Sequence, residues 1–260
     1  FQSKKTLFEQ TLLRFSDDRV FEKPIVITNE KYKSYVKEQS NKVSIELSEI
    51  VCEPVAKNTA VSCILGSHLS EKIYGEKLVI ISPTDHLMKN FNLNEKIIDI
   101  MIKRMQSKIL LIGVIPKYCS SEYGYIEFKE EIPETQNLYK VKSFLEKPDN
   151  SLAKKIYNND NFLWNTGIFL FNNRIHNLVF KDKFFNTYQT ISLVIDNSKK
   201  IDDCIILNSD TFKTIMTNDP FDKMYLETAF SEAIVTKHDS NWYDCGSQTS
   251  IEYLKKVNLI

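Results

Sequence analysis

Phe144-Leu145-Glu146-Lys147-Pro148-Asp149 is followed by Trp164-Asn165-Thr166-Gly167-Ile168-Phe169-Leu170-Phe171, and these two stretches decide how the chain is interpreted. Each is an apolar run typical of a β-strand, with hydrogen-bonding side chains where the chain is set to turn. On a strand the adjacent Glu146 and Lys147 face opposite ways, and Pro148 ends the ladder and favours an extended backbone at Lys147. The pattern predicts an ammonium group at the mouth of a sheet, where a phosphate binds, and an Asn165 amide suited to a sugar diol.

The bulk composition describes an ordinary globular protein. The chain has 260 residues, 42% of them hydrophobic, and a formal net charge of zero, which argues against nucleic acid as a partner but leaves room for a local anion site. No apolar run is long enough to span a membrane, so we expect no membrane partner. The five cysteines include no CxxC pair, which makes a disulfide framework or a zinc site improbable and favours a cytoplasmic location.

Apolar runs and helical patterns alternate along the first half of the chain. Strands are expected at 24–29, 43–52, 77–82 and 108–115, and helices at 7–15, 31–39, 59–74 and 93–105. In the second half, strands are expected at 123–128, 139–147, 163–172, 233–237 and 241–245, with an interrupted helical region at 173–216 and a closing helix at 248–257. This alternation predicts an α/β protein with a mixed, mostly parallel sheet flanked by helices. The simplest organisation is a single domain, 1–260, with lobes at 1–120 and 121–245.

Two aspartates lie at the tips of predicted strands, Asp85 after Ser82-Pro83-Thr84 and Asp244 after Trp242-Tyr243. If they converge, their carboxylates suit Mg²⁺, which favours oxygen ligands. Each aspartate alone is more often a turn former or a helix cap.

The segment Asn58-Thr59-Ala60 opens a helix whose N–H groups suit a phosphate or a base, or it is an ordinary cap. Gly124 allows a ligand to approach the backbone closely, or it marks a bulge. Lys147 and Asn165 also have purely structural alternatives. Lys147, before a proline, is typical of a solvated strand end, and Asn165, before Thr-Gly, of a turn.

Seven short motifs occur in order along almost the whole chain: Pro24-Ile25-Val26-Ile27-Thr28-Asn29-Glu30; Glu53-Pro54 through Lys57-Asn58-Thr59-Ala60; Ser82-Pro83-Thr84-Asp85-His86; Tyr123-Gly124-Tyr125-Ile126-Glu127; Phe144-Leu145-Glu146-Lys147-Pro148; Trp164-Asn165-Thr166-Gly167-Ile168-Phe169; and Trp242-Tyr243-Asp244-Cys245-Gly246-Ser247. Together they resemble the sugar-nucleotidyltransferase family, and within it the mannose-1-phosphate guanylyltransferases. The resemblance implies the Rossmann-like nucleotide-diphospho-sugar transferase fold with a smaller sugar-binding lobe. It also implies transfer of GMP from GTP to mannose 1-phosphate, giving GDP-mannose and pyrophosphate, with Mg²⁺ as the cofactor.

The resemblance also implies a role for each matched residue. The catalytic residues would be Asp85, Lys147 and Asp244, with Asp85 and Asp244 holding the metal. Sugar binding would fall to Gly124, Glu146, Asn165 and Gly167. The nucleotide would contact Lys57, Asn58, Thr59, Ala60 and Pro83.

Two departures from the family pattern stand out. The family's domain begins with a strand and a Gly-rich loop. This sequence contains neither, and we expect both in the full protein. Lys57 stands where the family usually has Arg, so a bidentate contact is lost. Two alternatives stay open: a related enzyme using another hexose 1-phosphate or nucleotide, and a catalytically silent relative that binds nucleotide sugars. A homodimer is also left open.

Overall fold

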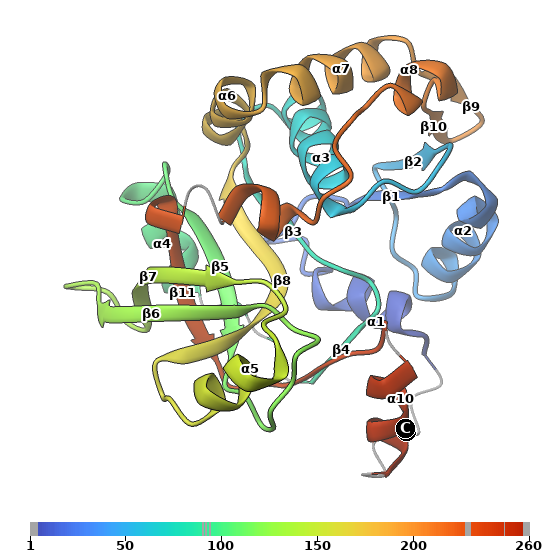
Figure 1. Ribbon diagram of the computed structural model, residues 1–260. Coiled ribbons are helices and arrows are strands. Elements are labelled where there is room, and N and C mark those ends of the chain that lie inside the picture. The colour runs from blue at the N-terminus through green and yellow to red at the C-terminus, as the bar shows by residue number, and fades with distance from the viewer. Residues whose placement is uncertain are drawn as a thin grey trace.

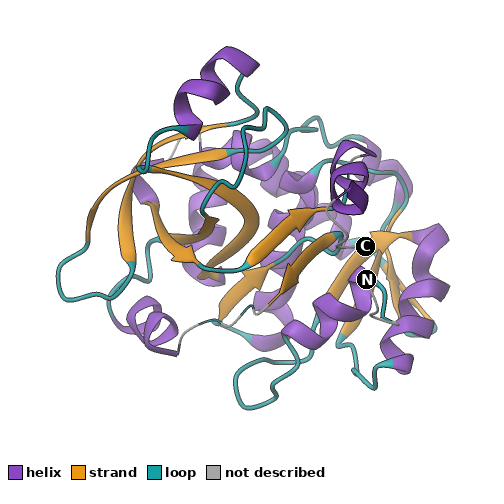
Figure 2. Ribbon diagram, turned by 90° about the horizontal axis from the view of Figure 1, so that it is seen from below, coloured by secondary structure: helices purple, strands orange, loops and turns teal. Residues whose placement is uncertain are grey.

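The strands in the described part of the chain form three sheets with helices around them. The structure is a computed structural model that describes residues 5–89, 91, 93, 95–226, 230–246 and 248–256. Figure 1 shows a smaller sheet at the top of the molecule and a larger sheet at the lower left. Seen from below in Figure 2, helices surround the strands.

The smaller of the two main sheets has the order β1-β2-β10-β9. Its strands are β1 (Ile25–Asn29), β2 (Glu49–Glu53), β10 (Cys204–Ile206) and β9 (Lys199–Ile201). The short helix η1 (Glu30–Tyr32) and α2 (Lys33–Lys42) connect β1 to β2, which pair in parallel, as a βαβ crossover requires.

The larger sheet has the order β3-β8-β5-β11-β7-β6. Its strands are β3 (Leu78–Ile81), β8 (Phe162–Asn172), β5 (Ile109–Val114), β11 (Ala233–His238), β7 (Leu138–Leu145) and β6 (Tyr125–Glu131). Alternate residues of β8 enter opposite cores: Phe169 and Phe171 enter one, and Ile168 and Leu170 enter the other. Because both faces are covered, the sequence of β8 is a continuous apolar run rather than an alternating one.

Helices supply the other half of each core. One core includes buried side chains of α3 (Thr59–Tyr74), α6 (Asn173–Lys183) and α7 (Phe185–Asp196), and the other includes side chains of α4 (Glu95–Lys103) and α5 (Asn150–Tyr157). The remaining helical segments are α1 (Leu7–Arg14), α8 (Ser209–Lys213), the π-helical turn η2 (Asp222–Leu226), η3 (Phe230–Glu232) and α10 (Gln248–Lys256). Within the described residues, every helix is too short or too polar to span a lipid bilayer.

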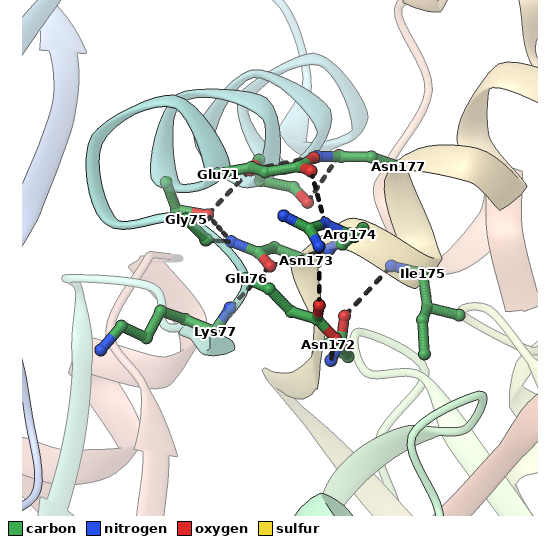
Figure 3. Close-up of polar contacts among 11 residues, drawn as sticks. Glu71, Gly75, Glu76, Lys77, Asn172, Asn173, Arg174, Ile175 and Asn177 are labelled. Carbon is green, nitrogen blue, oxygen red and sulfur yellow. Dashed lines mark hydrogen bonds and ion pairs between the residues drawn. The ribbon is translucent and has the colours of Figure 1, made fainter.

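A polar cluster fixes the junction between α3, β3 and α6 (Figure 3). The fully buried Asn173 donates from Nδ2 to Ser70 Oγ (3.1 Å) and to the Gly75 carbonyl (2.9 Å). Its Oδ1 accepts the backbone N–H groups of Lys77 (2.9 Å) and Arg174 (2.7 Å). One side chain therefore caps the end of α3, aligns the start of β3 and begins α6.

The predicted fold class is confirmed: this is a mixed α/β protein in which sheets are flanked by helices. Antiparallel pairing is more frequent among the described strands than the alternating pattern suggested. β5 and β11 are parallel, but β8 runs antiparallel to β3, β5 and β6, and β7 runs antiparallel to β6 and β11. A buried strand has the same apolar composition in either direction, so the sequence did not reveal this.

Candidate active site

Ten of the twelve predicted site residues line one large cavity, with a volume of about 1250 Å³. They are Asn58, Thr59, Pro83, Asp85, Gly124, Glu146, Lys147, Asn165, Gly167 and Asp244. These residues come from the N-terminus of α3, from the segments that follow β3 and β7, from the position just before β6, from within β8 and from the end of β12 (Asn241–Asp244). Ligand pockets are typically roughly 300–1000 Å³ in volume, so this space is large enough to hold a ligand.

A two-stranded ribbon brings Asp85 and Asp244 together. β4 (His86–Lys89) pairs antiparallel with β12 in a register that sets Asp244 opposite His86. The Cys245 N–H donates to the Asp85 carbonyl (3.1 Å), which extends the ladder by one step. The sequence indicated a strand at β12 but not β4, its partner.

Gly246 shows how close these two carboxylates lie. A Cβ on Gly246 would be 3.0 Å from Asp85 Oδ2 and 3.0 Å from Asp244 Oδ1. Those two oxygens are therefore no more than twice that distance apart. The Gly246 N–H also donates to Asp244 Oδ1 (2.7 Å), so this glycine leaves the space between the carboxylates clear and orients one of them.

His86 lies behind the two carboxylates. Its Nδ1 accepts the indole N–H of Trp242 (3.2 Å), which leaves the proton of the neutral ring on Nε2. Nε2 is 3.7 Å from Asp85 Oδ1 and 3.9 Å from Asp244 Oδ1. Burial lowers the pKa of His86, although the two carboxylates act in the opposite direction. The ring is therefore a neutral group between the two acids.

Lys147 does not have the extended backbone that its position before Pro148 predicted. β7 ends at Leu145, and Lys147 has φ of 44°, in the left-handed region. Because of this turn Lys147 Nζ lies 3.8 Å from Glu146 Oε1, so the two side chains share one side instead of facing opposite ways. A left-handed non-glycine residue stores strain, which is common at functional sites. The Lys147 side chain is 61% exposed and lines the cavity.

Position 124 requires a glycine because the carboxylate of Glu146 lies against its backbone. A Cβ at Gly124 would lie 2.8 Å from Glu146 Oε2 and 2.8 Å from Phe144 Cζ, closer than real contacts allow. The Gly124 carbonyl also accepts the N–H of Asn165 (2.8 Å). The glycine therefore lets Glu146 lie flat against the backbone, next to the strand that carries Asn165.

Asn165 and Gly167 belong to an irregularity in β8. The β5–β8 register shifts between Leu111 and Gly113, and the extra residues on β8 include Gly167 at φ 68°. Asn165 Oδ1 accepts the Gly167 N–H (3.2 Å), and Thr166 Oγ1 donates to the Ile112 carbonyl (2.8 Å). The strand expected at 163–172 is confirmed, and the Asn165-Thr166-Gly167 segment, for which a turn was the alternative, forms a bulge inside it; bulges are common next to active sites.

Asp222, at the start of η2, is a cavity residue that sequence reasoning missed. Its Oδ2 accepts the Asn165 Nδ2–H (3.0 Å). Burial raises the pKa of this carboxyl, and the nearby Lys147 charge acts in the opposite direction. Nothing in the local sequence, an acid after Pro220-Phe221, marked it, because its partner is far away along the chain.

Backbone N–H groups at the N-terminus of α3 are hydrogen-bonded to other groups of this protein. Asn58 Oδ1 accepts the Thr59 N–H (2.9 Å), and the Asp219 carbonyl accepts the Ala60 N–H (3.3 Å). Thr59 Oγ1 accepts the Phe221 N–H (2.9 Å). Asn58 and Thr59 still line the cavity, but two of the N–H groups expected to face a ligand already have partners.

Lys57 and Ala60 are the two predicted residues that do not line the cavity. Lys57 Nζ donates to the Ile215 carbonyl (2.6 Å), and Ala60 is fully buried. Pro83 follows β3 by two residues and lies against Gly167, where a Cβ would be 3.2 Å from Pro83 Cγ. Pro83 is therefore on the wall between the two aspartates and the bulge.

The donor set at the two aspartates suits a hard divalent cation. Asp85 and Asp244 present carboxylate oxygens across a space that a single Cβ would fill, and both side chains are partly exposed. No group of three or more His, Cys, Asp or Glu side chains in the described part of the chain forms a cage. Two carboxylates with room for water and substrate oxygens are the arrangement that Mg²⁺ uses beside phosphates.

The profile of the nucleotidyl transferase family matches residues 1–257. A Sinorhizobium fredii protein named mannose-1-phosphate guanylyltransferase is 34% identical over 170 residues, 65% of this chain and 33% of that protein. An Escherichia coli O157:H7 protein, mannose-1-phosphate guanylyltransferase 2, is 30% identical over 95% of this chain and 52% of its own length. The chain thus spans between a third and about half of these relatives.

Solved structures resemble the fold over nearly its whole length. The crystal structure titled mannose-6-phosphate isomerase from Helicobacter pylori has a TM-score of 0.78 at 22% identity, covering 94% of this chain and 92% of that one. A Thermus thermophilus structure titled mannose-1-phosphate geranyltransferase has a TM-score of 0.73 at 18% identity, covering 96% of this chain and 69% of that one. At these identities the likeness concerns the fold alone.

Proposed function

Because this chain belongs to the nucleotidyl transferase family, we propose that it transfers GMP from GTP to mannose 1-phosphate, releasing pyrophosphate. The observation that carries the proposal is that Asp85, Asp244 and Lys147 line one cavity with Asn165. The names of the guanylyltransferase relatives support the choice of base and sugar.

The reaction needs no covalent enzyme intermediate. A phosphate oxygen of the sugar forms a bond to the α-phosphorus of the nucleotide, and the bond from that phosphorus to the bridging oxygen of the β-phosphate breaks, releasing pyrophosphate. Both reactants are anions, so catalysis depends on positioning and charge neutralisation. The attacking phosphate is already ionised, and no side chain has to act as a base.

Each group of cavity residues has a distinct task in this proposal. Lys147 neutralises the sugar phosphate, and its left-handed backbone holds the ammonium group beside Glu146. Glu146 and Asn165 bind sugar hydroxyl groups. Asn58, Thr59 and Pro83 lie on the nucleotide side.

Asp85 and Asp244 would hold Mg²⁺, which when bound supplies positive charge for the triphosphate. His86, which is buried and accepts the indole N–H of Trp242, lies within 4 Å of both carboxylates. A cation at the two aspartates would balance part of the charge of the acids that line the cavity beside Lys147, which are Asp85, Asp244, Glu146 and Asp222.

We also infer where the strand and Gly-rich loop expected from the resemblance would lie. β1 and β3 are edges of separate sheets, yet both pack on α3 and both line the cavity. Their apolar runs are only partly buried apart from Val26, although such runs are typical of central strands. The face of α3 toward this space has small side chains, including Ser62 and Gly66. One further strand between β1 and β3 would join the two sheets.

Hydrogen exchange tests this placement. We would compare residues 1–260 with the complete encoded protein. If a strand fills the space, the amides of β1 and β3 exchange much more slowly in the complete protein. Equal exchange rates in β1 and β3 of both proteins would contradict the placement.

A substrate panel tests the proposed reaction. GTP, ATP, CTP and UTP would each be combined with mannose, glucose and galactose 1-phosphates, and pyrophosphate release would be measured with Mg²⁺ in the complete protein. We expect the highest kcat/KM for GTP with mannose 1-phosphate. A preference for another pair would identify a related nucleotidyltransferase. Binding of GDP-mannose without any pyrophosphate release would identify a silent relative.

A further inference from the structure

We propose that Asp222 is a positioning residue that fixes the amide of Asn165 in one orientation, so that this amide presents a defined donor and acceptor to a hydroxyl group of the sugar phosphate. The inference rests on the proposed function for the identity of the ligand. It assigns a task to a side chain outside the seven motifs.

The orientation of Asn165 is determined from both sides. The Gly167 N–H is a donor, so the atom that faces it at 3.2 Å has to be the oxygen, Oδ1. The Asp222 carboxylate is an acceptor, so the atom that faces Oδ2 at 3.0 Å has to be the nitrogen, Nδ2. Two independent contacts therefore select the same amide orientation.

These two contacts determine which hydrogen-bonding groups of the Asn165 amide remain for a ligand. An amide nitrogen has two hydrogens, and an amide oxygen has two lone pairs, so one of each remains after Asp222 and Gly167 are satisfied. Asn165 is 6% exposed and lines the cavity together with Asp222 and Lys147. A flipped amide would present a donor where the sugar requires an acceptor, which costs affinity because a desolvated polar group is left unpaired.

Asp222 is itself held firmly. It starts the π-helical turn η2, and the preceding Phe221 is fully buried and donates its N–H to Thr59 Oγ1. This contact connects the segment that carries Asp222 to the N-terminus of α3. The carboxylate that orients the sugar side of the cavity is thus attached to an element on the nucleotide side.

Side-chain amide exchange tests the orientation without any ligand. The Asn165 Nδ2–H₂ signals would be assigned by their loss in Asn165→Ala and followed in wild type, Asp222→Leu and Asp219→Leu. Asp219 is an exposed acid on the same segment, and its carboxylate lies 3.9 Å from Lys223. We expect exchange about tenfold faster in Asp222→Leu and unchanged in Asp219→Leu. Unchanged exchange in Asp222→Leu would overturn the proposal.

Binding and kinetics in the complete protein test the link to the sugar. We expect Asp222→Leu to raise the KM for mannose 1-phosphate about tenfold and to leave the KM for GTP within twofold. In an Asn165→Ala background Asp222→Leu should have little further effect, since the two residues act as a unit. An effect that persists in that background, for instance through the charge of Lys147, would overturn the proposal.

Asp222→Asn keeps the shape of the side chain if the leucine variant does not fold. It has one acceptor oxygen instead of two, so we expect a smaller rise in the sugar KM, about threefold, with the same dependence on Asn165. No rise would overturn the proposal. If wild type itself binds no hexose 1-phosphate, the proposed function fails, whereas amide exchange still decides whether Asp222 holds Asn165.

Discussion

At the residue scale, the titration of Glu53 gives the clearest link between burial and pH. Glu53 ends β2, is 7% exposed, and accepts a hydrogen bond from Ser62 Oγ (3.0 Å). Burial raises its pKa from 4.5 to about 7, against the opposite effect of Ser62. Between these two values the unfolded chain is ionised at Glu53 while the folded protein keeps the proton.

Glu53→Gln should therefore flatten the pH dependence of stability. Wild type loses stability as the pH rises from about 4.5 to 7, because the folded state binds the extra proton there. Above pH 7 we expect Glu53→Gln to be more stable than wild type by roughly 2–3 kcal/mol, and at pH 4 the two should be nearly equal. Urea unfolding at pH 4, 6 and 8 measures the free energy of unfolding of both proteins. A difference between them that does not depend on pH would contradict the raised pKa of Glu53 in the folded state.

Lys147 allows charge and backbone strain to be separated. Lys147→Ala and Lys147→Gly both remove the ammonium group, and we expect each to lower kcat/KM for mannose 1-phosphate by about 10- to 100-fold, with the KM for GTP within threefold. Lys147→Gly should be the more stable variant, because glycine adopts a φ of 44° without cost. Lys154→Ala, in the exposed part of α5, is the control. Undiminished use of the sugar phosphate would refute the role of Lys147.

At the element scale, the site depends on irregularities that local sequence rules describe poorly. The rule for a residue before proline predicted an extended Lys147, whereas its φ of 44° lies in the left-handed region. The Asn165-Thr166-Gly167 segment had the composition of a turn but lies in a bulge of a central strand. In both places the sequence indicated hydrogen-bonding groups where the chain turns, but it predicted neither the left-handed residue nor the bulge.

Other elements were missed because their partners are distant in the chain. β9 and β10 are three residues each, and they were assigned to a helical region because Lys199–Ile201 has no strand alternation. β4 is similarly short and depends on pairing with β12. The apolar runs of β5 and β8 were predicted because burial on both faces leaves a continuous pattern.

Asn173 should account for a large share of the stability at the α3–β3–α6 junction. Asn173→Ala leaves two part-buried backbone donors and two acceptors without this partner, so we expect a loss of about 2–4 kcal/mol in the free energy of unfolding. Asn186→Ala, at an exposed position of α7, should change stability by less than about 0.5 kcal/mol. Comparable effects of the two variants in urea unfolding would contradict the structural role of Asn173.

At the scale of the whole molecule, the cavity is assembled from parts that the sequence keeps far apart. The larger sheet includes β3 and β5 from the first half and β6, β7, β8 and β11 from the second. The tips of these strands and the β4–β12 ribbon bring the acids and Lys147 to one space. Ten residues of the cavity were predicted from their positions at strand ends and from the sequence motifs. Asp222 could not be predicted, because only the fold brings η2 to Asn165.

The central claim is that Asp85 and Asp244 work as one pair in nucleotidyl transfer. The most direct measurement is kcat for pyrophosphate release by Asp85→Asn, Asp244→Asn and the double variant, in the complete protein with Mg²⁺, GTP and mannose 1-phosphate, with circular dichroism to monitor folding. We predict that each single variant loses at least about 100-fold and that the double variant loses little more, since residues that act as a unit are not additive. Activity within threefold of wild type in either folded single variant would contradict the claim.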